Sequence, residues 1–96
     1  MKSLNINEIK KKVVPILRKE GATRAALFGS AARGEATEDS DIDILVDLPR
    51  GKTLFDLAGL KIELEKTLER DVDLITYNSI HPLLKSYILK DQLQLI

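Results

Sequence analysis

Residues 28–46 read Phe-Gly-Ser-Ala-Ala-Arg-Gly-Glu-Ala-Thr-Glu-Asp-Ser-Asp-Ile-Asp-Ile-Leu-Val, and this stretch decides the fold around it. Gly29 and Ser30 lie between the apolar run Ala25–Phe28 and the helix-prone residues 31–33, which predicts a sharp turn from a strand into a helix. Glycine lets the backbone approach a ligand closely, and the first turn of a helix leaves N–H groups free. Such a turn suits a phosphate group, to which the serine hydroxyl adds a donor.

Two carboxylates open the second half of the stretch. Asp41 and Asp43 flank Ile42 and lead into Ile44–Val46, a run with the length and β-branched content of a buried strand. In a strand, residues i and i+2 point the same way and lie roughly 6.5 Å apart along the chain. The two carboxylates are therefore expected to converge on a hard cation such as Mg²⁺.

A calcium-binding loop is the competing explanation for these acidic residues. Asp39, Asp41 and Asp43 match the first three ligand positions of such a loop. Its sixth position requires glycine and is Ile44 here, while its twelfth requires glutamate and is Arg50. The sequence therefore excludes a calcium loop of this type.

The order Gly-Ser, ten residues, Asp-x-Asp resembles the signature of the nucleotidyltransferase superfamily that includes DNA polymerase β. The short chain narrows the resemblance to the minimal nucleotidyltransferases, the small partners of HEPN proteins in prokaryotic toxin–antitoxin pairs. The family pattern requires a third carboxylate on a later strand, and Asp73 within residues 72–75 offers it. Asp71 competes because it would share the same face of that strand. The resemblance extends from about residue 23 to the terminal segment.

This resemblance implies an α/β (α+β) nucleotidyltransferase fold, a small mixed sheet flanked by helices. It implies that AMP is transferred from ATP to a hydroxyl, expected to be a tyrosine, of a HEPN toxin that the chain neutralises. The residues it marks as catalytic, and as ligands of two Mg²⁺ ions, are Asp41, Asp43 and Asp73. A binding-only antitoxin and a nucleotide-sensing module remain alternatives, although the intact set of three aspartates favours the enzyme.

The resemblance marks Gly29, Ser30 and Arg33 as nucleotide-binding residues. Arg33 has a second interpretation, as half of a surface ion pair with Glu35 or Glu38. Residue types do not decide between these two roles.

Composition limits the function further. The 96 residues predict a single domain, residues 1–96, and 15 basic residues balance 15 acidic ones. Direct nucleic-acid binding is not expected, because it generally relies on a basic surface and, for single strands, on stacking aromatics, of which only four occur here. The chain has no cysteine, no apolar run of membrane-spanning length and no signal-peptide pattern at its start, which predicts a soluble cytoplasmic protein without membrane contact.

Apolar periodicity and turn residues predict the remaining elements. Asn5 is expected to cap a first helix that Pro15 kinks or divides, and Thr53 to cap a helix that turns Leu54, Leu57, Leu60, Leu64 and Leu68 toward the sheet. His81 is expected to be structural or exposed rather than catalytic. The predicted helices are 5–20, 31–34, 53–69 and 82–90, and the predicted strands are 23–28, 42–46, 72–77 and a terminal edge strand within 92–96.

Overall fold

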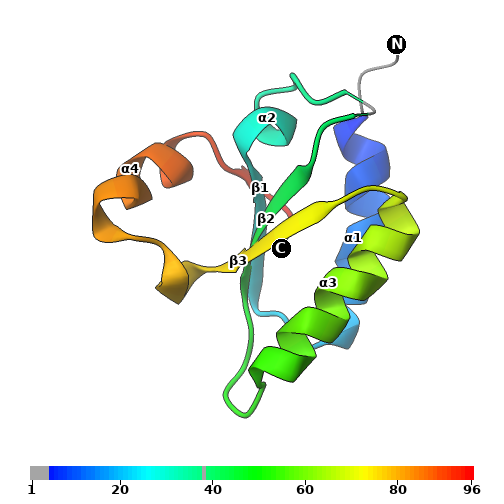
Figure 1. The fold of residues 1–96 in the computed structure, drawn as a ribbon, viewed down its shortest axis with the longest axis vertical. Helices are drawn as coiled ribbons and strands as arrows, with labels where there is room; N and C mark the ends of the chain where they lie inside the picture. Colours follow the sequence, from blue (N-terminus) through cyan, green and yellow to red (C-terminus); the bar gives the residue numbers. More distant parts are fainter. Residues whose placement is uncertain (1–4, 38) are drawn as a thin grey trace.

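A four-stranded mixed sheet forms the centre of the computed structural model, which describes residues 5–37 and 39–96. Its strands are β1 (Arg24–Phe28), β2 (Ile42–Asp47), β3 (Val72–Thr76) and β4 (Leu93–Gln94), in the spatial order β3-β2-β1-β4. β1 runs antiparallel to β2 and β4, whereas β2 and β3 are parallel (Figure 1). The mixed sheet and the terminal edge strand are thus confirmed.

Two long helices cover one face of this sheet. α1 (Ile6–Lys19) and α3 (Leu54–Leu68) lie side by side there, and α3 is the crossover that makes β2 and β3 parallel (Figure 1). Side chains from both helices and the three long strands form one apolar core, whose fully buried members include Val13, Leu17, Leu27, Ile44 and Leu64. Burial of this kind contributes about 25 cal/mol per Å² of apolar surface, so this layer dominates the stability of the fold.

Pro15 was expected to kink or divide the first helix, and the structure shows that it does not divide it. Asn5 caps α1 as expected, its side chain accepting a hydrogen bond from the N–H of Asn7 at 2.8 Å, and the helix then runs unbroken to Lys19. Pro15 is exposed, whereas its neighbours Val13 and Leu17 are fully buried. The carbonyl that loses its partner through Pro15 is therefore on the side where water can replace it.

The prediction that Leu54 faces the sheet is wrong. Leu54 is 82% exposed and Phe55 88%, whereas Leu60 and Leu64 are buried and Leu57 and Leu68 are partly buried. Thr53 and Asp56 form a capping box that starts α3 before it reaches the sheet. The first turn therefore projects beyond the core, and helical spacing alone does not reveal where the sheet ends.

The other face of the sheet carries short elements. These are α2 (Gly29–Ala32), the 3₁₀ helix η1 (Tyr77–Ser79) and α4 (Pro82–Lys90). Ile88 and Leu89 of α4 pack against a small apolar cluster of Phe28, Leu45 and Ile80 on this open face. Part of the face therefore stays uncovered (Figure 1).

The structure also bears on smaller expectations about the ends of α2 and β3, about His81 and about membrane-spanning helices. α2 begins two residues earlier than predicted, and β3 ends at Thr76 because Tyr77 already belongs to η1. His81 is structural, because its Nδ1 accepts a hydrogen bond from the N–H of Leu83 at 3.1 Å and caps α4. In the described part of the chain, no helix is long and apolar enough to cross a membrane.

Candidate functional site

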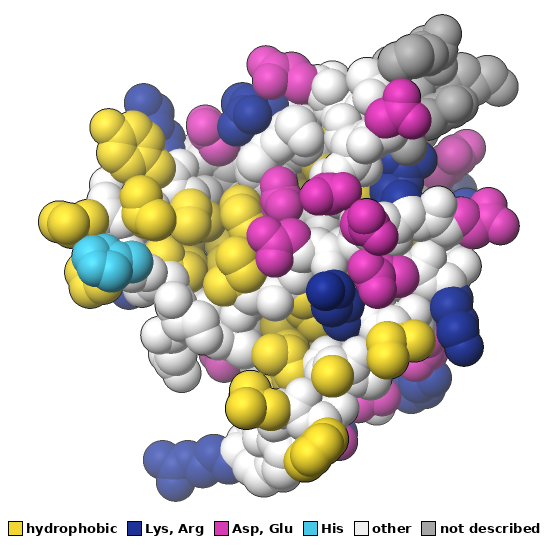
Figure 2. Space-filling view, in the orientation of Figure 1, with side chains coloured by type: hydrophobic (Ala, Val, Ile, Leu, Met, Phe, Trp, Pro, Cys, Tyr) yellow, Lys and Arg dark blue, Asp and Glu magenta, His cyan; other side chains and the backbone are white. Residues whose placement is uncertain are grey.

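The predicted carboxylates meet at one end of the open sheet face. Asp43 in β2 is directly level with Asp73 in β3, and with Phe28 in β1. Asp41 immediately precedes β2, and the N–H of Ile42 donates to the carbonyl of Asp71 at 3.0 Å. Strand alternation places Asp43 and Asp73 on the face that α1 and α3 leave open. Asp41 and Asp71 just precede these strands, and they line a hollow together with Asp73 and with Lys61 and Glu65 of α3. Figure 2 shows acidic side chains gathered there beside an apolar area.

The electrostatics of Asp43 show how close these charges are. Burial raises the pKa of the Asp43 carboxyl most, and the negative charges of Asp73 and Asp41 raise it further. Arg33 opposes this shift without cancelling it. The folded protein therefore holds a half-buried carboxylate that favours either a proton or a cation beside it.

The chemistry of this donor set fits Mg²⁺, which prefers carboxylate oxygens. Within residues 5–37 and 39–96, no three acidic or histidine side chains already lie close enough together to hold an ion. The role of Asp41, Asp43 and Asp73 as metal ligands stays a prediction, and the fit rests on residue chemistry and on the face that Asp43 and Asp73 share.

The Gly-Ser turn lies directly against Asp43. Gly29 has φ +66°, a conformation that favours glycine, and a Cβ added there would collide with Asp43 Oδ2 and lie 3.3 Å from its Cγ. Ser30 follows as the second residue of α2, and its carbonyl accepts a hydrogen bond from the N–H of Glu35 at 2.9 Å. The structure therefore places the turn and the carboxylates at one site. Phosphate binding by Gly29 and Ser30 stays a prediction.

Arg33 forms the surface ion pair that was one of its two interpretations. Its Nε lies 3.1 Å from Glu35 Oε2, and its Nη1 lies 4.0 Å from Asp91 Oδ2. Glu38, the other partner considered, is outside the described residues. Because Arg33 also lowers the pKa of Asp43, its charge acts on the site as well. Contact between Arg33 and a nucleotide stays a prediction.

Arg70 is a positioning residue that sequence reasoning missed. Its Nη1 donates to the carbonyls of Thr37 at 2.7 Å and Ser40 at 3.2 Å. The guanidinium thereby fixes the loop that leads into Asp41 to the start of β3. The sequence shows only an arginine just before the acidic residues 71–73. That pattern does not indicate a contact with a loop 30 residues earlier.

Comparison with known proteins shows the family of this chain. Residues 8–95 match the family model described as "Nucleotidyltransferase domain". The chain is 57% identical over 93 residues to a Methanocaldococcus jannaschii protein named "Putative protein adenylyltransferase MJ0435", covering 97% of this chain and 100% of that protein. It is 43% identical over 60 residues to "Protein adenylyltransferase MntA" of Thermococcus cleftensis, covering 62% of this chain and 61% of that protein.

Solved structures agree with these relatives. A "putative minimal nucleotidyltransferase" superposes with a TM-score of 0.82 at 35% identity, covering 97% of this chain and 98% of that one. A chain from a toxin–antitoxin crystal structure with AMP-PNP superposes with a TM-score of 0.79 at 28% identity, covering 91% of this chain and 72% of that one.

Proposed function

Because this chain belongs to the nucleotidyltransferase domain family, and within it to the minimal nucleotidyltransferases, we propose that it transfers AMP from ATP to a hydroxyl, expected to be a tyrosine, of a HEPN toxin. The chain would thereby act as the antitoxin of that toxin. One relative is named a protein adenylyltransferase, and one solved neighbour is a toxin–antitoxin structure with an ATP analogue. Both support the reaction and the kind of partner.

One observation carries the proposal: Asp43 and Asp73 are level with each other on an open sheet face, and the Gly29 turn packs on Asp43. Nucleotidyl transfer requires a triphosphate, an acceptor hydroxyl and negative side chains to meet at one place. The turn would supply backbone N–H groups for phosphate, and beside it burial and the negative charges of Asp73 and Asp41 raise the pKa of the Asp43 carboxyl. A merely structural turn would not need to lie against a half-buried acid whose pKa is raised.

The roles of the residues follow from the reaction. The acceptor oxygen forms a bond to the α-phosphorus of ATP, the bond to the β-phosphate breaks, and pyrophosphate leaves. Gly29 and Ser30 would hold the β- and γ-phosphates, and Asp73 would take the proton of the hydroxyl. A tyrosine hydroxyl has a pKa near 10, so it needs such an acceptor at neutral pH. Most of the acceleration would come from positioning and electrostatics.

Asp41, Asp43 and Asp73 would hold Mg²⁺, two ions by family resemblance. When bound, Mg²⁺ supplies the positive charge that stabilises the entering and leaving oxygens of the reaction.

Co-expression with a HEPN toxin tests the proposal. The intact mass of the toxin is expected to rise by one or more AMP units in the presence of the parent chain. Asp73→Asn is expected to keep partner association and nucleotide binding but to abolish the mass gain, leaving the toxin active and growth inhibited.

Asp71→Asn is the matched control, two residues away on the same face and also exposed, and it should retain transfer. Full protection by Asp73→Asn without any added mass would replace transfer by neutralisation through binding alone. Loss of transfer in Asp71→Asn only would show that Asp71 is the third acidic ligand.

A further inference from the structure

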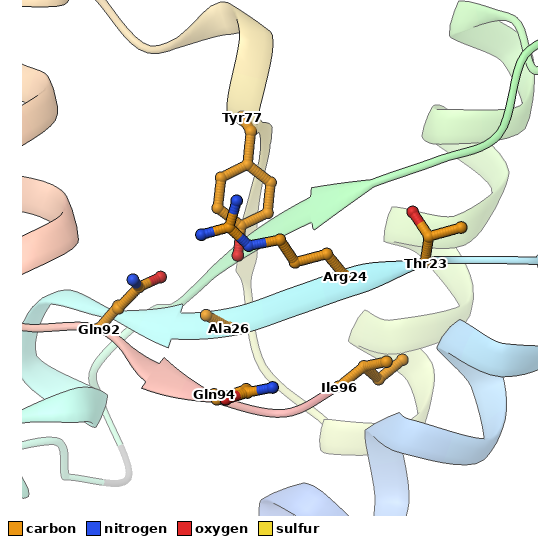
Figure 3. A pocket seen from close by; sticks show the side chains of 7 residues that line it. All are labelled: Thr23, Arg24, Ala26, Tyr77, Gln92, Gln94 and Ile96. Atoms are coloured by element: carbon orange, nitrogen blue, oxygen red, sulfur yellow. The ribbon is translucent and has the colours of Figure 1, made fainter.

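A second hollow lies on the open face, at the end away from the carboxylates. Its volume is 490 Å³, and its lining residues are Thr23, Arg24, Ala26, Tyr77, Gln92, Gln94 and Ile96 (Figure 3). Arg24 is level with Asp47, four residues beyond Asp43 and therefore about 13 Å away along β2. Leu45, a member of the apolar cluster that also contains Phe28 and Ile80, is level with Ala26 and so lies on the same face between these two levels. The hollow is thus separate from the carboxylate site.

Arg24 is the charged side chain of this hollow. Its guanidinium carbon lies over the Tyr77 ring, 4.2 Å from the ring centre, in a cation–π contact. Its cross-strand neighbour Asp47 does not pair with it, and within the described ranges no carboxylate lies within 4.0 Å of its nitrogens. The cation is therefore positioned but not neutralised by a direct ion pair.

The opposite wall offers neutral donors. Gln92 and Gln94 stand across the hollow from Arg24 (Figure 3), and their amides make no side-chain hydrogen bond to other residues in the part of the chain that the structure describes. Ala26 lies between them on β1, and its small side chain leaves room above the sheet. The Thr23 hydroxyl already donates to the Asp47 carbonyl at 3.3 Å, so it adds little.

We propose that this hollow binds a small oxyanion, a molecule with a phosphate or carboxylate group. The flat fork of guanidinium N–H groups matches such oxygens, and the amides of Gln92 and Gln94 supply further donors. None of the lining residues is acidic. Asp47 of β2, which is level with Arg24, lies outside the lining, although its negative charge acts on Tyr77.

Occupancy has a structural consequence. Tyr77 and Gln92 are the points where the segment bearing α4 leaves β3 and returns toward β4. An anion held between them links both ends of this segment. Because Ile88 and Leu89 of α4 pack on the cluster that contains Phe28, the residue before Gly29, the bound anion steadies the wall beside the carboxylate site.

Calorimetry on the full chain tests this proposal after divalent cations are removed with EDTA and the EDTA is removed by desalting, with inorganic phosphate and acetate as separate probes. Without divalent cations the carboxylate end repels anions, so binding reports on the second hollow. Arg24→Gln should weaken binding roughly tenfold to a hundredfold, the range expected when a charged hydrogen-bond donor is lost. Arg50→Gln removes the same charge from an exposed loop and should leave affinity within about twofold. The probe that loses affinity in Arg24→Gln identifies the chemical group.

Amide chemical shifts locate the anion. Shifts centred on Arg24, Gln92 and Gln94 support the proposal, whereas shifts centred on Gly29 and Ser30 overturn it. The proposal also fails if the parent binds neither probe, or if Arg24→Gln binds both as tightly as the parent. Nucleotidyl transfer is measured independently by mass, so these outcomes leave the proposed function standing.

Discussion

Gly29→Ala should lower the free energy of unfolding through two separable effects, and it should also weaken the site. The first is backbone strain, because a non-glycine residue at φ +66° costs of order 1–3 kcal/mol. The second is the collision of the new Cβ with the Asp43 carboxylate, an overpacking effect that typically costs about 1–3 kcal/mol. Together they predict a loss of roughly 2–6 kcal/mol, and each kcal/mol lowers the Tm of a domain this small by about 4–8 °C.

Gly34 provides the matched control. It has φ +73°, and a Cβ added there would meet nothing within 4 Å. Gly34→Ala should therefore show the strain alone, and the difference in unfolding free energy between the two variants isolates the collision. Urea denaturation measures both, provided that the m-value stays constant.

A double-mutant cycle with Asp43→Ala completes the test. Removing the carboxylate removes the colliding atoms, so Gly29→Ala in that background should cost only as much as Gly34→Ala. ATP affinity, measured by calorimetry, should fall in Gly29→Ala but not in Gly34→Ala. Equal costs for Gly29→Ala in both backgrounds would refute the packing of the turn on Asp43, and unchanged ATP affinity in Gly29→Ala would refute phosphate binding at the turn.

Three further predictions concern charge, positioning and packing. The raised pKa of Asp43 means that stability falls as pH rises from the ordinary value of 3.8 through the raised one, so Asp43→Asn in EDTA should raise the urea midpoint at pH 7 and not below pH 3. Arg70→Ala should cost about 1–3 kcal/mol and speed amide exchange in the loop before Asp41, because two carbonyls lose a charged donor. Leu64→Ala should cost about 2–5 kcal/mol, whereas Leu54→Ala should change the free energy of unfolding by less than about 0.5 kcal/mol.

The sequence was most informative where local chemistry is sufficient to determine the structure. Asn5 and Thr53 mark helix starts through capping, and Pro82 marks one through the preference of proline for the first helical turn; the structure confirms all three. Alternation in residues 92–96 was enough to indicate the edge strand. These signals lie within a few residues of the feature they predict, and no distant contact overrides them.

The sequence predictions were wrong or incomplete where the structure depends on where the sheet ends and on contacts between distant segments. Leu54 has the same helical spacing as Leu64, but only the latter lies over the strands. Pro15 was expected to kink or divide the first helix, but it lies on the exposed side of an α1 that continues to Lys19. The contact of Arg70 with Thr37 likewise depends on how β3 aligns with the loop before β2.

The choice between Asp71 and Asp73 shows the same limit, and the strand register bears on it. Both residues lie on one face by strand alternation, so no pattern within β3 separates them. The register between β2 and β3, set by the α3 crossover, places Asp73 level with Asp43. Asp73 is accordingly the stronger of the two neighbouring charges that raise the pKa of Asp43, whereas Asp71 is not among the causes of that shift. Asp43 is also the residue on which the Gly29 turn packs. The geometry therefore favours Asp73 over Asp71 as the carboxylate that would bind the same metal ion as Asp43.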